Sequence, residues 1–373
     1  MRIGLLRESK DRELRVALLP ENVQWLTRHG HPVRMQSGAG EGSGLTDDQY
    51  RKAGAEVVEE PADVIAGSDL ITKVKEPTAA EVAMMQPGQV VWSYLHLAAD
   101  EELLRRILEA EIIALGFETV QASDGTLPIL VPMSEVAGRL AVQIGAHWLQ
   151  GDQGGRGVLL GGVPGVDRGR VTILGAGVVG TAAVRIAYGL GADVTVLDLD
   201  HRRLAHLYDI YHGELHTLFS NPGNLERSVT QADLVIGAVL VPGARAPVLV
   251  SREWVSRMNP GAVIVDVAVD QGGCVETTRV TSHSDPVYRV EGVLHYGVAN
   301  IPGAVPRTST FALANASFPY LQDLAERGLE EALRADPSLA RGVNCWRGRV
   351  THEEVALAQD RPYAEAPWRA SRP

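Results

Sequence analysis

The sequence predicts an α/β protein with two doubly wound parallel sheets. Its 373 residues are enough for two domains at roughly 100–200 residues per domain. Short β-branched runs alternate with helical patterns of about ten residues, which is typical of βαβ units with right-handed crossovers. Hydrophobic residues make up 45% of the chain and charged residues 22%, so the composition supports ordinary globular cores.

The first predicted domain combines residues 1–128 with residues 307–373. Its strands are expected in the segments MRIGLL, PVRMQ, DLITKVKE, QVVWSYL and EIIALGFETV, and its first helices over 21–29 and 47–53. Beyond Pro306 the pattern is helical, over 308–325 and 329–335, and we expect these helices to complete the first domain. Residues 361–373 contain three prolines and no periodicity, which predicts a disordered tail.

The second predicted domain spans residues 129–306. Pro128 and Pro132 interrupt the pattern, and Ser134 begins a long apolar-periodic segment, so we expect a linker helix over 134–150. The strands that follow are expected in VTIL, DVTVLDLD, DLVIGAV, AVIVDVAVD and VLHYGVAN. These are nearly continuous apolar runs, as parallel strands covered on both faces require.

Charge and cysteine usage exclude several classes of protein. Lys plus Arg number 35 and Asp plus Glu 46, and the net charge of −11 argues against a nucleic-acid or anionic-membrane partner. Only Cys274 and Cys345 occur, in no CxxC spacing, so neither a disulfide framework nor a metal site is predicted. A reducing compartment, the cytoplasm, is expected.

Neither export nor membrane insertion is predicted. The N-terminal segment MRIGLLRESK is charged from its second residue and has no apolar run before a small-residue cleavage site. The longest weakly charged stretch, 171–197, contains Arg185 and Asp193 and many glycines. These features favour a buried strand–helix–strand unit over a membrane span.

A glycine-rich turn points to a dinucleotide cofactor. Gly175-Ala-Gly177-Val-Val-Gly180 follows the strand VTIL directly and opens a helix, as in a Rossmann-like domain. Gly175 permits the tight turn, Gly177 lets the backbone approach a pyrophosphate, and Gly180 lets the helix pack on the sheet. The helix N-terminus would then hold the anion. The alternative is a glycine-rich turn in an α/β protein that binds no nucleotide.

An acid at the end of the next strand strengthens the cofactor prediction. Asp198 lies near the expected spacing of ~20 residues and would accept hydrogen bonds from a ribose 2′-hydroxyl. Because a carboxylate repels a 2′-phosphate, Asp198 favours NAD over NADP. Arg202 and Arg203 lie close enough in sequence to weaken that preference.

Two basic residues of the first domain are candidates for substrate binding. Arg15 lies in ELRVALLP, and a guanidinium can bind a carboxylate through two parallel hydrogen bonds. From position alone, a solvated surface arginine is the stronger interpretation. Lys75 ends the predicted strand DLITKVK, and ligands bind where strands of such sheets end. Lys73 lies two residues before Lys75, so on a strand its side chain would lie on the same face. Either lysine could be a surface charge.

Two titratable residues at predicted strand ends are candidates for proton transfer. His96 follows WSYL, and an imidazole with an ordinary pKa near 6.5 suits amine or carbonyl chemistry at neutral pH. A structural histidine is an equally good interpretation of that position. Asp270 ends the apolar run AVIVDVAVD, where a carboxylate would lie at the cofactor crevice. Asp266 is the alternative candidate, although its position within the predicted strand favours a structural role.

Taken together, these segments are similar to those of the alanine dehydrogenase family, which is related to the NAD-binding subunit of transhydrogenase. The resemblance runs from about residue 1 to 355 and rests on RVALLP, GAGEGSG, KVKEP, YLHLAAD, PMSEVAGRLA, GGRGVLLGGVPGV, LGAGVVGT, VIGAVLVPGARAP, VIVDVAVDQGGC, SHSDP and VANIPGAVPRTST. Such a set is far more specific than a single glycine motif. The resemblance implies a catalytic domain built from both chain ends around a central NAD domain, and a homohexamer.

The resemblance also implies roles for individual residues. Arg15 and Lys75 become the substrate-binding pair, and His96 and Asp270 the catalytic pair. The implied cofactor-binding residues are the glycines of the turn with Ser134, Val178, Val179, Asp198, Ser220, Val239, Leu240, Val267, Asp270, Arg279, Val298, Asn300 and Ile301.

The implied reaction is the NAD-dependent, reversible oxidative deamination of L-alanine to pyruvate and ammonia. The alternatives are a related dehydrogenase that acts on a larger amino acid or imine, as in the saccharopine type, and a non-catalytic NAD-binding protein. A transhydrogenase subunit would need a membrane partner and additional chain. The N-terminal signature of the family reads Pro-Lys-Glu where this chain has Leu6-Arg7-Glu8. The sequence also departs from the family pattern at Leu19, Trp92 and Ile301, and these changes could reshape the substrate pocket.

Overall fold

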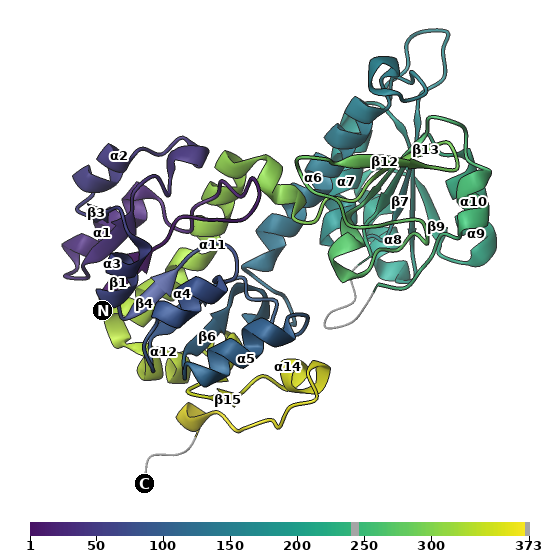
Figure 1. Ribbon diagram of the computed structural model, residues 1–373. Helices are drawn as coiled ribbons and strands as arrows, with labels where there is room; N and C mark the ends of the chain where they lie inside the picture. The colour runs from purple at the N-terminus through teal and green to yellow at the C-terminus, as the bar shows by residue number, and fades with distance from the viewer. Residues whose placement is uncertain (240–245, 370–373) are drawn as a thin grey trace. The chain divides into compact units, whose positions relative to one another are not determined.

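The computed structural model describes residues 1–239 and 246–369, which form two compact units (Figure 1). Unit 1 comprises Met1–Met133 and Val305–Pro373, and unit 2 comprises Ser134–Ala304. Each unit has its own mostly parallel sheet, so the predicted fold class is confirmed. No helix within the described ranges combines the length and the apolar character that a membrane crossing requires.

The sheet of unit 1 has the strand order β15-β14-β6-β5-β4-β1-β2-β3. Its strands are β1 (Ile3–Leu5), β2 (Val33–Gln36), β3 (Glu56–Val58), β4 (Leu70–Thr72), β5 (Val90–Ser93), β6 (Ile113–Gly116), β14 (Val343–Trp346) and β15 (Arg349–Val350). Strands β1 to β6 pair in parallel, whereas β14 pairs antiparallel with both β6 and β15. The carboxyl ends of β4 and β5 therefore lie side by side.

Helices from both ends of the chain complete unit 1. They are α1 (Pro20–Arg28), α2 (Asp47–Lys52), α3 (Pro61–Ala66), α4 (Ala79–Met84), α5 (Glu101–Glu109), α11 (Pro306–Arg327), α12 (Leu329–Ala335), α13 (Pro337–Arg341) and α14 (Glu353–Ala358). Helix α11 packs on α1 through the rings of Phe318 and Trp25, whose centroids are 5.8 Å apart. The hydroxyl of Thr310 on α11 accepts a hydrogen bond from Val16 N and lies 2.8 Å from Ser43 Oγ.

The C-terminal segment differs from the prediction. The antiparallel strands β14 and β15 follow the predicted helices in a stretch for which no strand was predicted, and the predicted disorder is wrong for residues 361–369. Tyr363 pairs with Val350, and the Trp368 side chain is only 5% exposed, with its ring centroid 4.9 Å from that of Trp346. A short segment without periodicity is ordered here because it buries a large aromatic side chain. Residues 370–373 lie outside the described part of the chain.

The sheet of unit 2 has the strand order β12-β13-β11-β10-β7-β8-β9. Its strands are β7 (Arg170–Leu174), β8 (Asp193–Asp198), β9 (His216–Phe219), β10 (Leu234–Gly237), β11 (Val263–Asp266), β12 (Val287–Val290) and β13 (Val293–Tyr296). All pair in parallel except β12, which is antiparallel to β13. The order reverses between β7 and β10, and ligands of open α/β sheets bind at such a switch point.

Helices α7 (Val178–Gly189), α8 (His201–Ile210), α9 (Pro222–Gln231) and α10 (Arg252–Ser256) connect the strands of unit 2. The long helix α6 (Leu130–Trp148) begins four residues before the predicted start. Pro132 is its third residue, where an N–H group has no partner within the helix, so the proline does not interrupt it. A Cβ atom added to Gly138 of α6 would lie 2.1 Å from the carbonyl oxygen of Val179, so glycine allows α6 to approach α7 closely.

Candidate active site

Two candidate residues of unit 1 meet at the carboxyl edge of its sheet. Lys75 follows β4 and His96 follows the adjacent strand β5. The Lys75 Nζ atom lies 3.5 Å from His96 Nε2. Neighbouring parallel strands carry both side chains to the same edge, which is where ligands bind in such sheets. The geometry thus places an amine and an imidazole within reach of one small ligand.

Arg15 is buried rather than solvated. Its side chain is 2% exposed, and Glu13 Oε1 and Oε2 accept hydrogen bonds from Arg15 Nε and Nη2 at 2.7 and 2.5 Å. Burial lowers the pKa of Arg15, but the hydrogen bonds and charge of Glu13 outweigh it and raise this pKa above its ordinary value. Arg15 Nη1 lies 3.4 Å from Met133 Sδ. The surface interpretation of Arg15 is therefore wrong, and the orientation of its guanidinium is fixed.

Tyr94 connects Arg15 with His96. The Tyr94 ring stacks on that of His96 with centroids 6.1 Å apart, and its hydroxyl donates a hydrogen bond to Ile129 O at 2.9 Å. Burial raises the pKa of Tyr94, although the nearby charge of Arg15 lowers it. Tyr94 is therefore a neutral phenol at physiological pH, and its hydroxyl bond to Ile129 O holds the ring beside His96.

The structure distinguishes Lys75 from Lys73. The Lys73 side chain is 1% exposed, and its Nζ donates hydrogen bonds to Glu81 Oε1 and Oε2 at 3.0 and 2.9 Å. Glu8 Oε2 lies 3.9 Å from the same nitrogen. Strand β4 ends at Thr72, so period two no longer applies at Lys73, and this lysine belongs to a buried ion-pair network.

Glu8 was not predicted as a functional residue. Its Oε1 atom accepts hydrogen bonds from the backbone N–H groups of Val74 and Lys75 at 2.6 and 3.3 Å, so it holds the segment that carries Lys75. Burial raises the pKa of Glu8 to about 7, against the charge of Lys73. The one signal in the sequence is an acid two residues after the segment of the first predicted strand, and the charged run from Arg7 to Glu13 obscures it.

The pKa of Glu8 predicts a pH-dependent stability. The folded protein holds this proton more tightly than the unfolded chain, whose ordinary pKa is 4.5, so the contribution to stability is complete below pH 4.5 and is lost as the pH rises through about 7. A tenfold change in proton affinity corresponds to ~1.4 kcal/mol, so the loss is on the order of 3 kcal/mol.

Glu8→Gln removes this titration and keeps the side-chain shape. We expect the melting temperature of Glu8→Gln, relative to the unmodified protein, to rise between pH 4.5 and about pH 7 and to level off above that. The matched control is Glu59→Gln, which changes an exposed carboxylate of the same unit. A difference between Glu8→Gln and the unmodified protein that does not vary with pH would contradict the assignment.

The dinucleotide turn of unit 2 has the geometry that its glycines require. Gly175 follows β7 with φ +105°, a backbone conformation that residues with a side chain rarely adopt. A Cβ atom added to Gly180 would lie 1.8 Å from the carbonyl oxygen of Gly175. Gly177 precedes the first turn of α7, whose backbone N–H groups and dipole can hold a pyrophosphate.

Asp198 ends β8 and supports the same turn. Its Oδ2 atom accepts a hydrogen bond from Ala176 N at 2.6 Å, and its Oδ1 accepts one from Asp200 N at 2.7 Å. Arg203 Nη1 lies 3.7 Å from Asp198 Oδ2, whereas Arg202 is mostly exposed and pairs with Asp200. A shallow pocket beside the turn is lined by Ala176, Thr181, Asp200, Arg202, Arg203 and His206. Asp198 is thus the carboxylate closest to the turn.

The other cofactor candidates mostly follow carboxyl ends of strands in the same sheet. Ser220 follows β9, Val239 follows β10, Val267 follows β11 and Val298 follows β13, whereas Ser134 lies inside α6, and Arg279, Asn300 and Ile301 lie in the segments before β12 and after β13. Leu240 lies outside the described residues. Within those residues, no group of three or more His, Cys, Asp and Glu side chains is arranged to hold a metal ion.

Asp270 and Asp266 differ in burial. Strand β11 ends at Asp266, so Asp270 does not end a strand as predicted but lies exposed in the 3₁₀ helix Val267–Gln271, where Asn300 N donates to its Oδ2 at 3.4 Å. Asp266 is buried and accepts hydrogen bonds from Ala268 N and Cys274 N at 3.1 and 2.9 Å. Burial raises the pKa of Asp266. Asp266 therefore organises the turn that presents Asp270.

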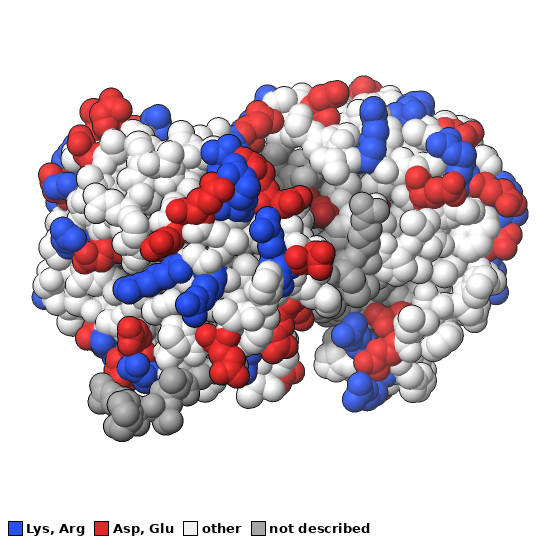
Figure 2. All heavy atoms as spheres, turned by 60° about the horizontal axis from the view of Figure 1, so that its bottom comes forward, with Lys and Arg blue, Asp and Glu red and all other residues white. Residues whose placement is uncertain are grey.

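The departures from the family pattern lie mainly in packed cores. The Trp92 ring contacts the Phe117 ring edge-on with centroids 4.6 Å apart, and Trp92 is 1% exposed. Leu6, Leu19 and Ile301 are also buried. On the face shown in Figure 2, Lys and Arg side chains are interspersed with Asp and Glu.

Both halves of the chain match one family. The model described as "Alanine dehydrogenase/PNT, N-terminal domain" matches residues 4–137, and that described as "Alanine dehydrogenase/PNT, C-terminal domain" matches residues 141–353. The chain is 49% identical to an alanine dehydrogenase of Methanococcus maripaludis over 367 residues, and 51% identical to one of Staphylococcus saprophyticus over 366 residues, with 98% of each chain covered in both comparisons.

Solved structures agree with the sequence comparisons. An L-alanine dehydrogenase superposes with a TM-score of 0.93 at 49% identity, covering 96% of this chain and 99% of the other. A transhydrogenase from Sinorhizobium meliloti superposes with a TM-score of 0.80 at 27% identity, covering 95% and 99%. By the family models and by near-complete coverage at about half identity, this chain belongs to the alanine dehydrogenase/PNT family.

Proposed function

We propose that this protein catalyses the NAD-dependent, reversible oxidative deamination of L-alanine to pyruvate and ammonia. The observation that carries this proposal is the Lys75–His96 pair, 3.5 Å apart at one sheet edge, in a chain about half identical to alanine dehydrogenases. The pair supplies the two things the reaction needs from unit 1, namely a cation for the substrate carboxylate and an acid/base group.

Arg15 and Lys75 would bind the substrate carboxylate. Glu13 fixes the plane of the Arg15 guanidinium, and Glu8 fixes the backbone of Lys75, so both cations are oriented before the substrate arrives. Such preorganisation lets binding energy hold the Cα–H bond in one direction. The neutral Tyr94 ring stacks on His96 and restricts the orientation of its imidazole.

His96 would carry the proton traffic of the reaction. When bound, a nicotinamide cofactor accepts hydride from the substrate Cα or returns it in the amination direction. His96 Nε2 takes a proton from the water that adds to the resulting iminium carbon and returns it to the nitrogen of the carbinolamine. The C–N bond then breaks, ammonia leaves, and the hydroxyl becomes the carbonyl of pyruvate as its proton passes back to His96. The carboxylate of Asp270 would orient the protonated amine or the water. The imidazole of His96 can gain a positive charge and the carboxylate of Asp270 carries a negative one, and such a pair suits these successive steps.

The cofactor would be held by unit 2 at the turn formed by Gly175, Gly177 and Gly180. We infer that NAD is preferred over NADP because the Asp198 carboxylate repels a 2′-phosphate and accepts hydrogen bonds from a 2′-hydroxyl. Arg203 lies near this carboxylate and tempers the repulsion. We also propose that the protein is a homohexamer, which its mass in solution would test. We place this hexamer in the cytoplasm.

Asp198→Asn is expected to shift the ratio of the NADPH and NADH dissociation constants by ~10-fold in favour of NADPH, which corresponds to ~1.4 kcal/mol. The amide keeps an oxygen for Ala176 N, loses the oxygen that accepts from Asp200 N, and removes the charge that opposes a phosphate. The measurement is a fluorescence titration with each reduced cofactor. Asp193→Asn, at the other end of β8, is the matched control. An unchanged ratio in Asp198→Asn would assign cofactor choice to other residues.

A substrate panel tests the function itself. NADH consumption is measured with pyruvate, glyoxylate and bulkier keto acids, each with and without ammonium. We expect turnover only with ammonium and the highest kcat/KM with pyruvate. A preference for a bulkier keto acid would indicate a related amino-acid dehydrogenase, and NADH binding without turnover would indicate a non-catalytic NAD-binding protein.

A further inference from the structure

We propose that Glu118 and Gln359 are positioning residues that together hold His96 in a strained backbone conformation, with its imidazole facing Lys75. The proposal rests on the proposed role of His96 as the general acid/base. The side chains of both residues contact the backbone of the segment formed by residues 95–98 and act through it. We call this segment the His96 loop.

The His96 loop carries its strain at His96. The backbone φ of His96 is +52°, in the left-handed region that side chains with a Cβ atom disfavour. Such a conformation persists only when surrounding contacts determine it, and strained residues of this kind gather at functional sites. Something in the structure must therefore hold the loop against relaxation to a negative φ.

Glu118 supplies one set of these contacts. It lies in the 3₁₀ helix Phe117–Thr119 directly after β6, the strand next to β5. Its Oε1 atom accepts a hydrogen bond from His96 N at 2.7 Å, and both of its oxygens lie 3.2 Å from Leu95 N. One carboxylate thus binds two successive N–H groups, and a concave backbone that directs successive N–H groups inward is a favourable anion site.

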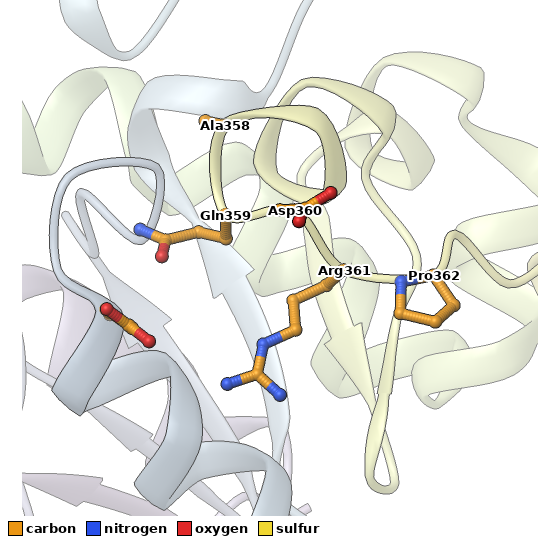
Figure 3. A pocket seen from close by; sticks show the side chains of 6 residues that line it. Ala358, Gln359, Asp360, Arg361 and Pro362 are labelled. Carbon is orange, nitrogen blue, oxygen red and sulfur yellow. The ribbon is translucent and has the colours of Figure 1, made fainter.

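Gln359 supplies the contacts on the other side of His96. It follows α14, and its Nε2 atom donates hydrogen bonds to the carbonyl oxygens of Leu97 and Ala98, both at 3.0 Å. Figure 3 shows its side chain extending away from its own segment, separately from that of Arg361. The Gln359 backbone N–H bonds to Val355 O at 3.1 Å, which fixes the side chain at its base.

The two contacts are complementary. Glu118 binds N–H groups before and at His96, and Gln359 binds carbonyl groups after it, so the loop is fixed on both sides of the strained residue. Without them, the backbone would relax and the imidazole would leave its position 3.5 Å from Lys75 Nζ. The C-terminal segment, 262 residues from Leu97 in sequence, therefore contributes to positioning the acid/base group.

Kinetics of single variants test this positioning. We expect Glu118→Ala to lower kcat for pyruvate amination ~10- to 100-fold, since a misplacement of about 1 Å can cost that much, while the NADH dissociation constant stays within about twofold. Glu118→Gln should recover most of the rate, because one amide oxygen can accept both N–H groups. Equal loss in the alanine and glutamine variants would overturn the role of the carboxylate as an acceptor.

Gln359→Glu tests the second contact with an isosteric change. It presents carboxylate oxygens to the carbonyls of Leu97 and Ala98, so we expect kcat to fall ~10-fold. Arg361→Ala, at an exposed position of the same segment, is the matched control and should keep the full rate. A Gln359→Glu variant as active as Arg361→Ala would overturn the proposal for Gln359.

A stability measurement tests the strain without relying on catalysis. Glycine tolerates a positive φ and alanine does not, so His96→Gly should melt at a higher temperature than His96→Ala when Glu118 is present. In the Glu118→Ala background the loop relaxes, and we expect this difference to vanish or reverse. We call the difference in melting temperature between His96→Gly and His96→Ala the glycine advantage. The same glycine advantage in both backgrounds would show that Glu118 does not hold the strain.

The two failures can be told apart. If His96→Ala remains active while the glycine advantage depends on Glu118, the proposed role of His96 is wrong but the loop is held as described. If His96→Ala is inactive and the glycine advantage ignores Glu118, the positioning proposal alone is wrong. Should Glu118→Ala not fold, Glu118→Asp, which shortens the reach to His96 N, replaces it in both experiments.

Discussion

Replacing His96 by alanine is expected to lower the turnover number for pyruvate amination by ~10²–10⁴-fold, the usual contribution of one general acid/base. The imidazole faces Lys75 at the sheet edge, and the reaction requires proton transfer both when water adds and when ammonia leaves. The effect should appear in kcat at saturating pyruvate and ammonium. Stopped-flow measurement of NADH oxidation checks it directly.

The control for this variant is His29→Ala. It removes an imidazole that follows α1 in the same unit and stacks on Trp25, far from the predicted chemistry in sequence. The His29→Ala variant should turn over normally, and both variants should bind NADH like the unmodified protein. Near-full turnover in His96→Ala with normal NADH binding would assign the proton transfers to another group.

Replacing Gly180 by alanine is expected to raise the NADH dissociation constant at least ~100-fold, which corresponds to about 2.7 kcal/mol. The added Cβ atom would lie 1.8 Å from Gly175 O, so either the turn or the start of α7 must move. Either movement takes the backbone N–H groups out of the arrangement that holds a pyrophosphate. Isothermal titration or NADH fluorescence measures the change.

Two further glycines make this test specific. Gly189 is the last residue of α7, an added Cβ atom there meets nothing within 4 Å, and Gly189→Ala should bind NADH normally. At Gly177 an added Cβ atom meets only Arg203 Nη1, at 3.8 Å, so Gly177→Ala should fold yet still bind weakly, because it blocks approach of the pyrophosphate. Normal NADH binding by Gly180→Ala would place the cofactor elsewhere.

Several elements of the fold follow from local patterns. Helix α2 follows Thr46, whose hydroxyl accepts a hydrogen bond from Gln49 N, and the continuous apolar runs of unit 2 became buried parallel strands. Strand ends were less predictable. Asp270 reads as the end of a strand, but the buried Asp266 caps a 3₁₀ turn and ends β11 four residues earlier.

The tail shows why other elements could not be predicted. Proline-rich sequence without periodicity is typical of disorder, yet residues 361–369 are ordered because Trp368 packs against Trp346. Gln359 likewise has no local signal, since its partners Leu97 and Ala98 lie far away in sequence. Such contacts depend on which segments the completed sheet brings together.

By itself, the sequence determined the alternation of strands and helices, the glycine turn with its following acid, and the family to which the chain belongs, because these depend on spacing along the chain. Only the tertiary structure placed Lys73 in a buried ion pair with Glu81, buried Arg15 against Glu13, and fixed the backbone of His96 between Glu118 and Gln359. Burial and hydrogen bonding between distant segments arise from packing, and no local pattern encodes which side chain will lie beneath another.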